Sequence, residues 1–145
     1  AGRRVPGFGA ALGWAAGRQR LRRSRLVLGD AFADPDLLDG EFDEFFLQPL
    51  HRSRAHRDAA TRLLRSFDLR LVDGLRELHA MIDVPVQLIW GEHDKFFPVE
   101  WARKMVGDFT NASLTVVPDA GLFSHEERPA QVAHALLPML TGRTR

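Results

Sequence analysis

The 145-residue sequence contains no cysteine. This absence excludes disulfide bonds, thiolate nucleophiles and zinc sites built from cysteine. It also fits a reducing compartment, so we expect a cytoplasmic location. Long hydrophobic runs are missing too: the uncharged apolar-rich stretch Val5–Gly17 is interrupted by four glycines and is too short to cross a bilayer. No signal peptide is readable. We therefore expect no membrane partner.

Patterns for metal or cofactor binding are weak. His51 and His56 lie five residues apart with no nearby cluster of carboxylates, which is not the pattern of a metal site. The glycines at 7, 9 and 13 resemble a phosphate-binding fingerprint, but no strand pattern precedes them. We therefore expect no metal and no cofactor.

Charge is distributed unevenly although the net charge is only +1. Residues 1–29 carry arginines and no acidic residue, whereas residues 30–44 carry acidic residues and no basic one. The two groups could pair within the chain, form a solvated basic helix face, or leave a basic patch for nucleic acid. No aromatic side chain interleaves with the arginines of residues 18–25, so a platform for stacked bases is missing. We expect no nucleic-acid partner.

The first half of the chain has the periodicity of helices. A composition of 45% hydrophobic and 27% charged residues suits a packed globular domain. Apolar residues recur at three- and four-residue steps, which predicts helices over 8–28, 35–48, 54–67 and 71–82. Pro49 is expected to end the second of these helices.

The second half alternates between strand and helix patterns. The apolar runs 84–90 and 114–117 are typical of strands buried on both faces. Helices are predicted from Pro98 and from Pro129, the latter kinked or ended by Pro138. This order predicts an α/β fold with a βαβα unit and parallel strands. Two strands are few for such a sheet, so we expect the remaining strands to lie in sequence outside these 145 residues.

Two residues in the loops after these strands are the candidate site. Asp94 follows the first strand and His125 follows the second. Parallel strands end at the same edge of a sheet, where α/β proteins place catalytic groups. A carboxylate that orients an imidazole makes a general base. The structural alternatives are a turn cap for Asp94, a surface position for His125, and a helix-capping box made by Ser124 and Glu127.

The stretch from Ile82 to Leu140 resembles the C-terminal part of α/β-hydrolase-fold enzymes, in the branch of epoxide hydrolases and haloalkane dehalogenases. The segment Val84–Asp94 looks like the penultimate strand and its acid loop in that family, and Phe97-Pro98 and Glu126–Pro129 are also characteristic. The helical first half is similar to the cap of that fold. The resemblance thus implies a partial α/β-hydrolase fold, with residues 1–68 as cap and 69–145 as core.

The same resemblance implies a hydrolase for an ester, epoxide or carbon–halogen bond, with a small apolar substrate and an acyl- or alkyl-enzyme intermediate. In that family Asp94 and His125 would be the acid and base. The nucleophile of the family sits in a glycine-framed turn. No serine here has such flanking glycines; the serines are Ser24, Ser53, Ser66, Ser113 and Ser124. We expect the nucleophile outside this chain, and the chain alone to be inactive.

Leu122 departs from the family pattern. Many members have Gly-His where this sequence has Gly121-Leu122, and His125 lies three positions later. Leucine cannot accept a proton. The alternative is therefore a catalytically inactive member of the fold that binds a small apolar ligand. An autonomous helical binding module is a further alternative.

Overall fold

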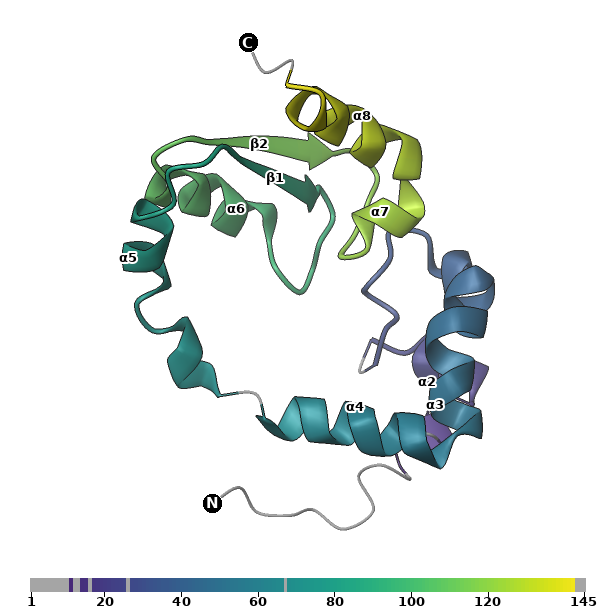
Figure 1. The fold of residues 1–145 in the computed structure, drawn as a ribbon. Coiled ribbons are helices and arrows are strands. Elements are labelled where there is room, and N and C mark those ends of the chain that lie inside the picture. The colour runs from purple at the N-terminus through teal and green to yellow at the C-terminus, as the bar shows by residue number, and fades with distance from the viewer. Residues whose placement is uncertain (1–10, 12–13, 16, 26, 67, 143–145) are drawn as a thin grey trace. The chain divides into compact units, whose positions relative to one another are not determined.

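The computed structural model describes residues 11, 14–15, 17–25, 27–66 and 68–142 (Figure 1). The chain divides into two compact units. The first, called the helical unit, comprises Ala1–Gly29 and Pro35–Arg70; the second, called the sheet unit, comprises Asp30–Asp34 and Leu71–Arg145. Among the described residues, no helix is both long and apolar enough to span a membrane.

Short helices make up the helical unit. In chain order they are α2 (Gln19–Arg22), a 3-10 turn (Pro35–Asp39), a π-helical turn (Asp43–Leu47), α3 (Gln48–Arg52) and α4 (Arg54–Ser66). Leu38, Phe42 and Leu47 are buried and supply apolar packing in this unit. The helix α4, which covers Arg54–Ser66, confirms the helix expected over 54–67.

The helix expected over 8–28 is wrong in its C-terminal part. Residues 8–10, 12–13, 16 and 26 of that range lie outside the described residues. The helix α2 ends at Arg22, and the chain then turns back through hydrogen bonds from the backbone N–H of Leu28 to the carbonyl of Arg22 and from Gly29 to Ser24. A Cβ on Gly29 would lie 2.1 Å from the carbonyl oxygen of Arg23, so this close approach requires glycine.

Pro49 does not end a helix, contrary to expectation. It lies in the first turn of α3, where the missing N–H of proline would have had no helical partner in any case. The preceding π-helical turn shifts the hydrogen-bond register just before this new start. Helical structure therefore continues to Arg52.

Arginines and aspartates of the charge-separated sequence pair within the helical unit. The guanidinium of Arg22 is buried and lies 2.8 Å from Asp39 and 2.9 Å from Asp43. Arg23 lies 2.8 Å from Asp39 and also pairs with Asp36. Intramolecular pairing, one of the three alternatives, is therefore what the structure shows for these two arginines.

These ion pairs affect the pKa of Asp39. Burial would raise the pKa of this carboxyl, but hydrogen bonds from Gln19 and Arg22 and the charges of Arg23 and Arg22 outweigh it and lower the pKa below its ordinary value. A carboxyl whose pKa is lower in the folded than in the unfolded state stabilises the fold when ionised.

The sheet unit contains a two-stranded parallel sheet. β1 (Val86–Gly91) pairs with β2 (Ala112–Val117) in a register that runs from Val86 opposite Ala112 to Gly91 opposite Val117. The other elements are α5 (Leu75–Ala80), α6 (Val99–Met105), a 3-10 turn (Val106–Asp108), α7 (Ser124–Glu127) and α8 (Pro129–Leu140). A further 3-10 turn (Leu69–Val72) includes the point in the sequence at which the helical unit ends and the sheet unit resumes. The expected order of strand, helix, strand and helix with parallel strands is confirmed.

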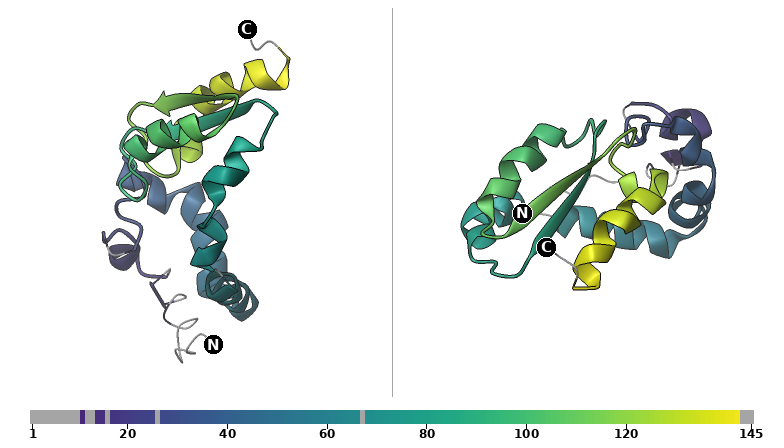
Figure 2. Two further views of the ribbon diagram at one scale, coloured as in Figure 1. Left: turned by 90° about the vertical axis from the view of Figure 1, so that its left-hand side faces the viewer. Right: turned by 90° about the horizontal axis from the view of Figure 1, so that it is seen from above.

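Helices α6 and α8 pack against both strands, on opposite faces of the sheet (Figure 2). Two details of the expected helices differ. Pro138 was expected to kink or end the last helix; it does not end α8, which continues to Leu140. The helix expected over 71–82 is shortened to α5, because Gly74 adopts a left-handed conformation with φ of 80° immediately before it.

Glu127 holds the backbone around the end of the sheet. This glutamate is 7% exposed, and its Oε1 accepts hydrogen bonds from the N–H of Ala33 at 2.6 Å and of Asp34 at 3.1 Å. Its Oε2 accepts a hydrogen bond from the N–H of Gly121. One carboxylate thus joins segment 30–34 to the loop after β2.

Two glycines allow three backbone segments to stack at this point. A Cβ on Gly91 would lie 2.0 Å from the carbonyl oxygen of Gly121, and a Cβ on Gly121 would lie 2.7 Å from that of Ala31. The carbonyl of Ala31 also accepts a hydrogen bond of 2.9 Å from the N–H of Leu122. Larger residues at 91 or 121 would force these segments apart.

Replacing Asp39 by asparagine should destabilise the chain in a pH-dependent way. At pH 7 we expect a loss of about 1–2 kcal/mol in the free energy of unfolding, because hydrogen bonds to a charged group are lost. Since the pKa of Asp39 is lowered in the folded state, this difference should be complete above about pH 5 and shrink as the pH falls below about 4. Urea unfolding across this pH range measures it. Asp36→Asn is the control, because that carboxylate is 83% exposed; an equal effect of both variants would contradict the assignment.

Glu127→Gln should destabilise the sheet unit by about 2–3 kcal/mol, because a glutamine cannot accept hydrogen bonds on both sides of its side chain. The N–H of Gly121 should lose protection from hydrogen exchange, since Glu127 is its acceptor. Glu126→Gln on the same short helix is the matched control. If both variants unfold at the same urea concentration, Glu127 does not have the proposed role.

Candidate active site

Asp94 lies in the loop that follows β1 and is 7% exposed. Its Oδ1 accepts hydrogen bonds from the backbone N–H of Phe96 at 2.9 Å and of Phe97 at 2.8 Å. These bonds shape the loop as an Asx-type turn, which is the structural role considered for this residue. They also fix the carboxylate at the carboxyl end of a parallel strand.

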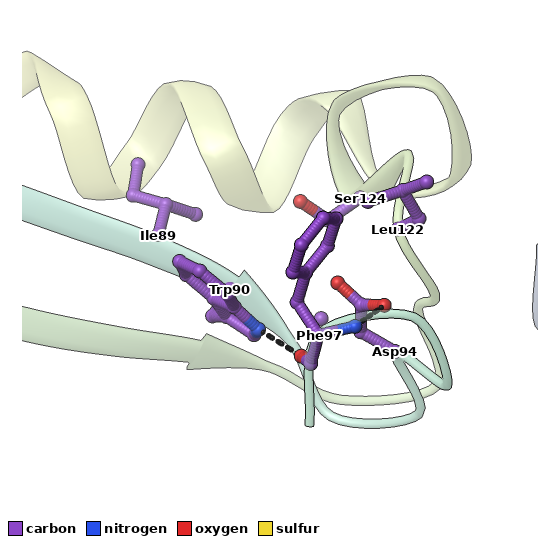
Figure 3. A pocket seen from close by; sticks show the side chains of 7 residues that line it. Ile89, Trp90, Asp94, Phe97, Leu122 and Ser124 are labelled. Atoms are coloured by element: carbon purple, nitrogen blue, oxygen red, sulfur yellow. Dashed lines mark hydrogen bonds between the residues drawn. The ribbon is translucent and has the colours of Figure 1, made fainter. Parts of the chain in front are cut away.

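A pocket of about 140 Å³ opens beside this carboxylate. Its lining comes from the end of β1, the loop after β1 and the segment that leads into α7: Ile89, Trp90, Gly91, Asp94, Phe97, Leu122 and Ser124. In Figure 3 the side chains of Asp94, Phe97 and Ser124 gather at one end of the pocket, past the side chains of Ile89 and Trp90. Four apolar side chains line the pocket together with the two polar ones of Asp94 and Ser124.

A hydrogen bond joins Trp90 and Phe97 at this pocket. The indole Nε1 of Trp90 donates a hydrogen bond of 2.7 Å to the carbonyl of Phe97 (Figure 3). The ring of Phe97 in turn meets that of Trp101 edge to face, with centroids 6.2 Å apart. The strand end and the loop that carries Asp94 are thereby held at a defined spacing.

The two loops of the candidate site lie side by side, as expected for parallel strands. The N–H of His93 donates to the carbonyl of Ala120 at 2.8 Å, and that of Glu92 donates to Val117 at 3.0 Å. The loop after β1 is thus bonded directly to the loop after β2.

His125 is the second residue of the four-residue helix α7, and its side chain is 60% exposed. Its Nε2 lies 3.7 Å from Oε1 of Glu126, and its ring meets that of Phe123 edge to face at 6.1 Å. Within the described part of the chain, His125 has no hydrogen bond or ion pair with Asp94 and does not line the pocket. The residues placed beside Asp94 are Leu122 and Ser124, and the pairing of Asp94 with His125 stays a prediction.

The cationic side chains near Asp94 are engaged elsewhere. Lys95 lies 2.9 Å from Asp30, and His93 lies 4.0 Å from Glu92 and 3.9 Å from Asp119. Among the residues that the structure describes, no lysine, arginine or histidine pairs with Asp94. Its carboxylate is therefore buried with backbone partners alone.

Two features of the site were not expected from the sequence. Ser124 was considered as half of a capping box, yet α7 begins without a side-chain cap and the hydroxyl belongs to the pocket. Glu127, the other half, binds the backbone of segments 33–34 and 121 instead. The available signal was an acidic pair just before Arg128-Pro129, but its long-range backbone partners leave no local pattern.

The described residues contain no group of three histidine, aspartate or glutamate side chains able to hold a metal ion. The pocket itself offers a fixed carboxylate, a hydroxyl and apolar side chains. Such a carboxylate can orient an N–H donor and stabilise a positive charge on it.

Known proteins share this fold and part of this sequence. An uncharacterized hydrolase, YugF, of Bacillus subtilis (strain 168) is 29% identical over 100 residues, which are 69% of this chain and 35% of that protein. The structure of an esterase from Exiguobacterium antarcticum matches with a TM-score of 0.57 and 20% identity, over 92% of this chain and 47% of that one.

An α/β hydrolase fold protein from Burkholderia ambifaria matches with a TM-score of 0.60 and 23% identity, over 94% of this chain and 52% of that one. The chain thus spans about half the length of these structures, and about a third of the length of the hydrolase from B. subtilis. The sequence model of the Alpha/beta hydrolase family matches residues 1–135. With that match over most of its length, and with the parallel sheet and helices of the same fold, the chain belongs to the alpha/beta hydrolase family.

Proposed function

We propose that this chain is part of a hydrolase that cleaves an ester, epoxide or carbon–halogen bond of a small apolar substrate. The observation that supports this is a buried carboxylate, Asp94, fixed at the carboxyl end of a parallel strand and open to a pocket lined by four apolar side chains and Ser124. In an α/β sheet this is where catalytic groups are found. The branch of epoxide hydrolases and haloalkane dehalogenases is the proposed relationship within the family.

In the proposed reaction a serine or aspartate from sequence outside these 145 residues attacks a carbon of the substrate and forms an acyl- or alkyl-enzyme. The bond from that carbon to the ester alcohol, the epoxide oxygen or the halogen breaks in this step, and the ester alcohol leaves with a proton, the ring oxygen stays on the substrate as a hydroxyl, or the halogen leaves as halide. His125 then takes a proton from water, and the water oxygen attacks the intermediate and breaks its bond to the enzyme. Asp94 holds the imidazole in one tautomer and stabilises its protonated form. For this role the side chain of His125 must turn from Glu126 toward Asp94, since it lies beside Glu126 in the structure.

Residues 1–68 would act as the cap of this enzyme. A cap of this kind excludes water and adds apolar walls to the substrate site. The proposal places the protein in the cytoplasm, with neither metal nor organic cofactor. The chain alone would lack the covalent step, because it supplies no nucleophile of the family type.

A second function is favoured by one specific observation: Leu122, and not a histidine, lies in the pocket with Asp94. Leucine cannot take a proton from water. Under this alternative the protein has the fold of a hydrolase without its turnover and binds a small apolar ligand in the same pocket.

The hydrolase proposal predicts large losses of turnover in a longer protein that includes the nucleophile. Asp94→Asn and His125→Ala should each lower kcat for 4-nitrophenyl acetate, or for an epoxide or chloroalkane substrate, by about 10³–10⁴-fold, as loss of a triad member does. Asp119→Asn, which removes an exposed carboxylate of the neighbouring loop, should leave kcat unchanged. Near-parental kcat in both Asp94 and His125 variants would rule out the assigned roles.

The substitution Leu122→His distinguishes the two functions. If the pocket is a degraded active site, the longer protein should hydrolyse these substrates at background rate, and Leu122→His should raise the rate by placing an imidazole beside Asp94. Leu122→Gln is the matched control, because it adds a polar side chain that is not a base. Measurable parental turnover that Leu122→His does not increase would contradict the inactive alternative.

A further inference from the structure

We propose that the pocket beside Asp94 binds the ammonium group of a small primary amine that carries one apolar group. This proposal rests on the second function above, a ligand-binding pocket, and specifies the chemistry of its ligand. It depends on three properties of the pocket: the state of the Asp94 carboxylate, the hydroxyl of Ser124, and the volume and lining of the cavity.

The carboxylate of Asp94 has one occupied and one open oxygen. Oδ1 accepts from both Phe96 and Phe97, whereas Oδ2 has no hydrogen-bond partner among the described residues. Oδ2 is not sealed in the protein interior, because it is absent from the buried polar atoms that lack partners. It therefore remains accessible to a donor that enters the pocket.

A cation is the missing partner of this carboxylate. Burying a carboxylate costs free energy that a paired positive charge offsets. Lys95, the nearest lysine in sequence, is 2.9 Å from Asp30 instead, and His93 and His125 lie beside other carboxylates. Since none of the described cationic side chains pairs with Asp94, its open oxygen can accept a charged donor from a ligand.

Ser124 adds a second polar contact at the same end of the pocket. The residue is 7% exposed, and its hydroxyl has no hydrogen-bond partner among the described residues. A hydroxyl can accept one N–H while the carboxylate accepts another, and a primary ammonium offers three donors. Figure 3 shows the side-chain oxygens of Asp94 and Ser124 near the ring of Phe97.

The remaining walls select an apolar group of limited size. Ile89, Trp90, Phe97 and Leu122 surround a volume of about 140 Å³. A cavity of about 150 Å³ accepts a molecule the size of benzene. Benzylamine, which is protonated at neutral pH and joins one ring to one ammonium, is therefore a suitable probe.

Binding can be followed in the 145-residue chain through the indole N–H signals of its tryptophans in ¹H–¹⁵N NMR spectra. Trp90 lines the pocket and donates to Phe97, so benzylamine should shift its indole signal in a saturable way. The signal of Trp101, which is not part of the lining, is the internal control. Toluene and benzyl alcohol have the same ring without the charge.

We expect benzylamine to bind at least about tenfold more tightly than toluene, as a hydrogen bond to a charged group predicts. Asp94→Asn should remove this preference and leave toluene binding unchanged. Ser124→Ala should weaken benzylamine binding about threefold, as the loss of a neutral hydrogen bond predicts. Asp119→Asn removes the same charge from an exposed site in the neighbouring loop and should change nothing.

Equal affinities for benzylamine and toluene, or benzylamine binding that survives both Asp94→Asn and Ser124→Ala, would overturn recognition of the ammonium while leaving an apolar binding pocket intact. If none of the three probes shifts the Trp90 signal, the inference fails and the ligand-binding function fails with it. Should Asp94→Asn not fold, the ranking of the three probes on the unchanged chain still decides the question.

Discussion

A buried carboxylate surrounded by backbone N–H groups is the constraint on which the sheet unit depends. Glu127 receives three such groups, two from segment 33–34 and one from Gly121. Without them a buried negative charge would cost more than the neighbouring apolar contacts return. Because each partner comes from the backbone, the interaction fixes the course of the chain there regardless of which side chains it carries. The position of Leu122, and with it one wall of the pocket, follows from this arrangement.

Asp94 is also a buried carboxylate that accepts backbone hydrogen bonds, but only one of its two oxygens accepts them. Like Glu127 it is 7% exposed, but both of its hydrogen bonds end on a single oxygen. Glu127 has used both oxygens and can only be structural, whereas Asp94 keeps one for a partner that is not part of its own loop. The difference between a structural and a functional acid in this unit is thus the number of oxygens that the backbone occupies.

The strands, the last helix and the position of Asp94 could be predicted because each depends on local sequence. Apolar runs bounded by Gly91 and Pro118 define the strands, and their parallel pairing follows from the helix between them. The turn after Arg22, the role of Glu127 and the pocket position of Ser124 could not be predicted, because they arise from contacts between distant segments. The prediction for Pro49 is wrong because a proline that begins a helix and a proline that ends one look alike in sequence.

The two proposed functions differ in the origin of the N–H donor that binds the second carboxylate oxygen of Asp94. A histidine of the same protein would make the carboxylate part of a catalytic pair, and a ligand would make it a recognition group. The structure brings Leu122 and Ser124 to the pocket and leaves His125 beside Glu126. The imidazole of His125 can serve as base only if its side chain turns from Glu126 toward Asp94. A ligand amine needs no such movement, since the open oxygen, the hydroxyl and the apolar walls are already arranged around one cavity.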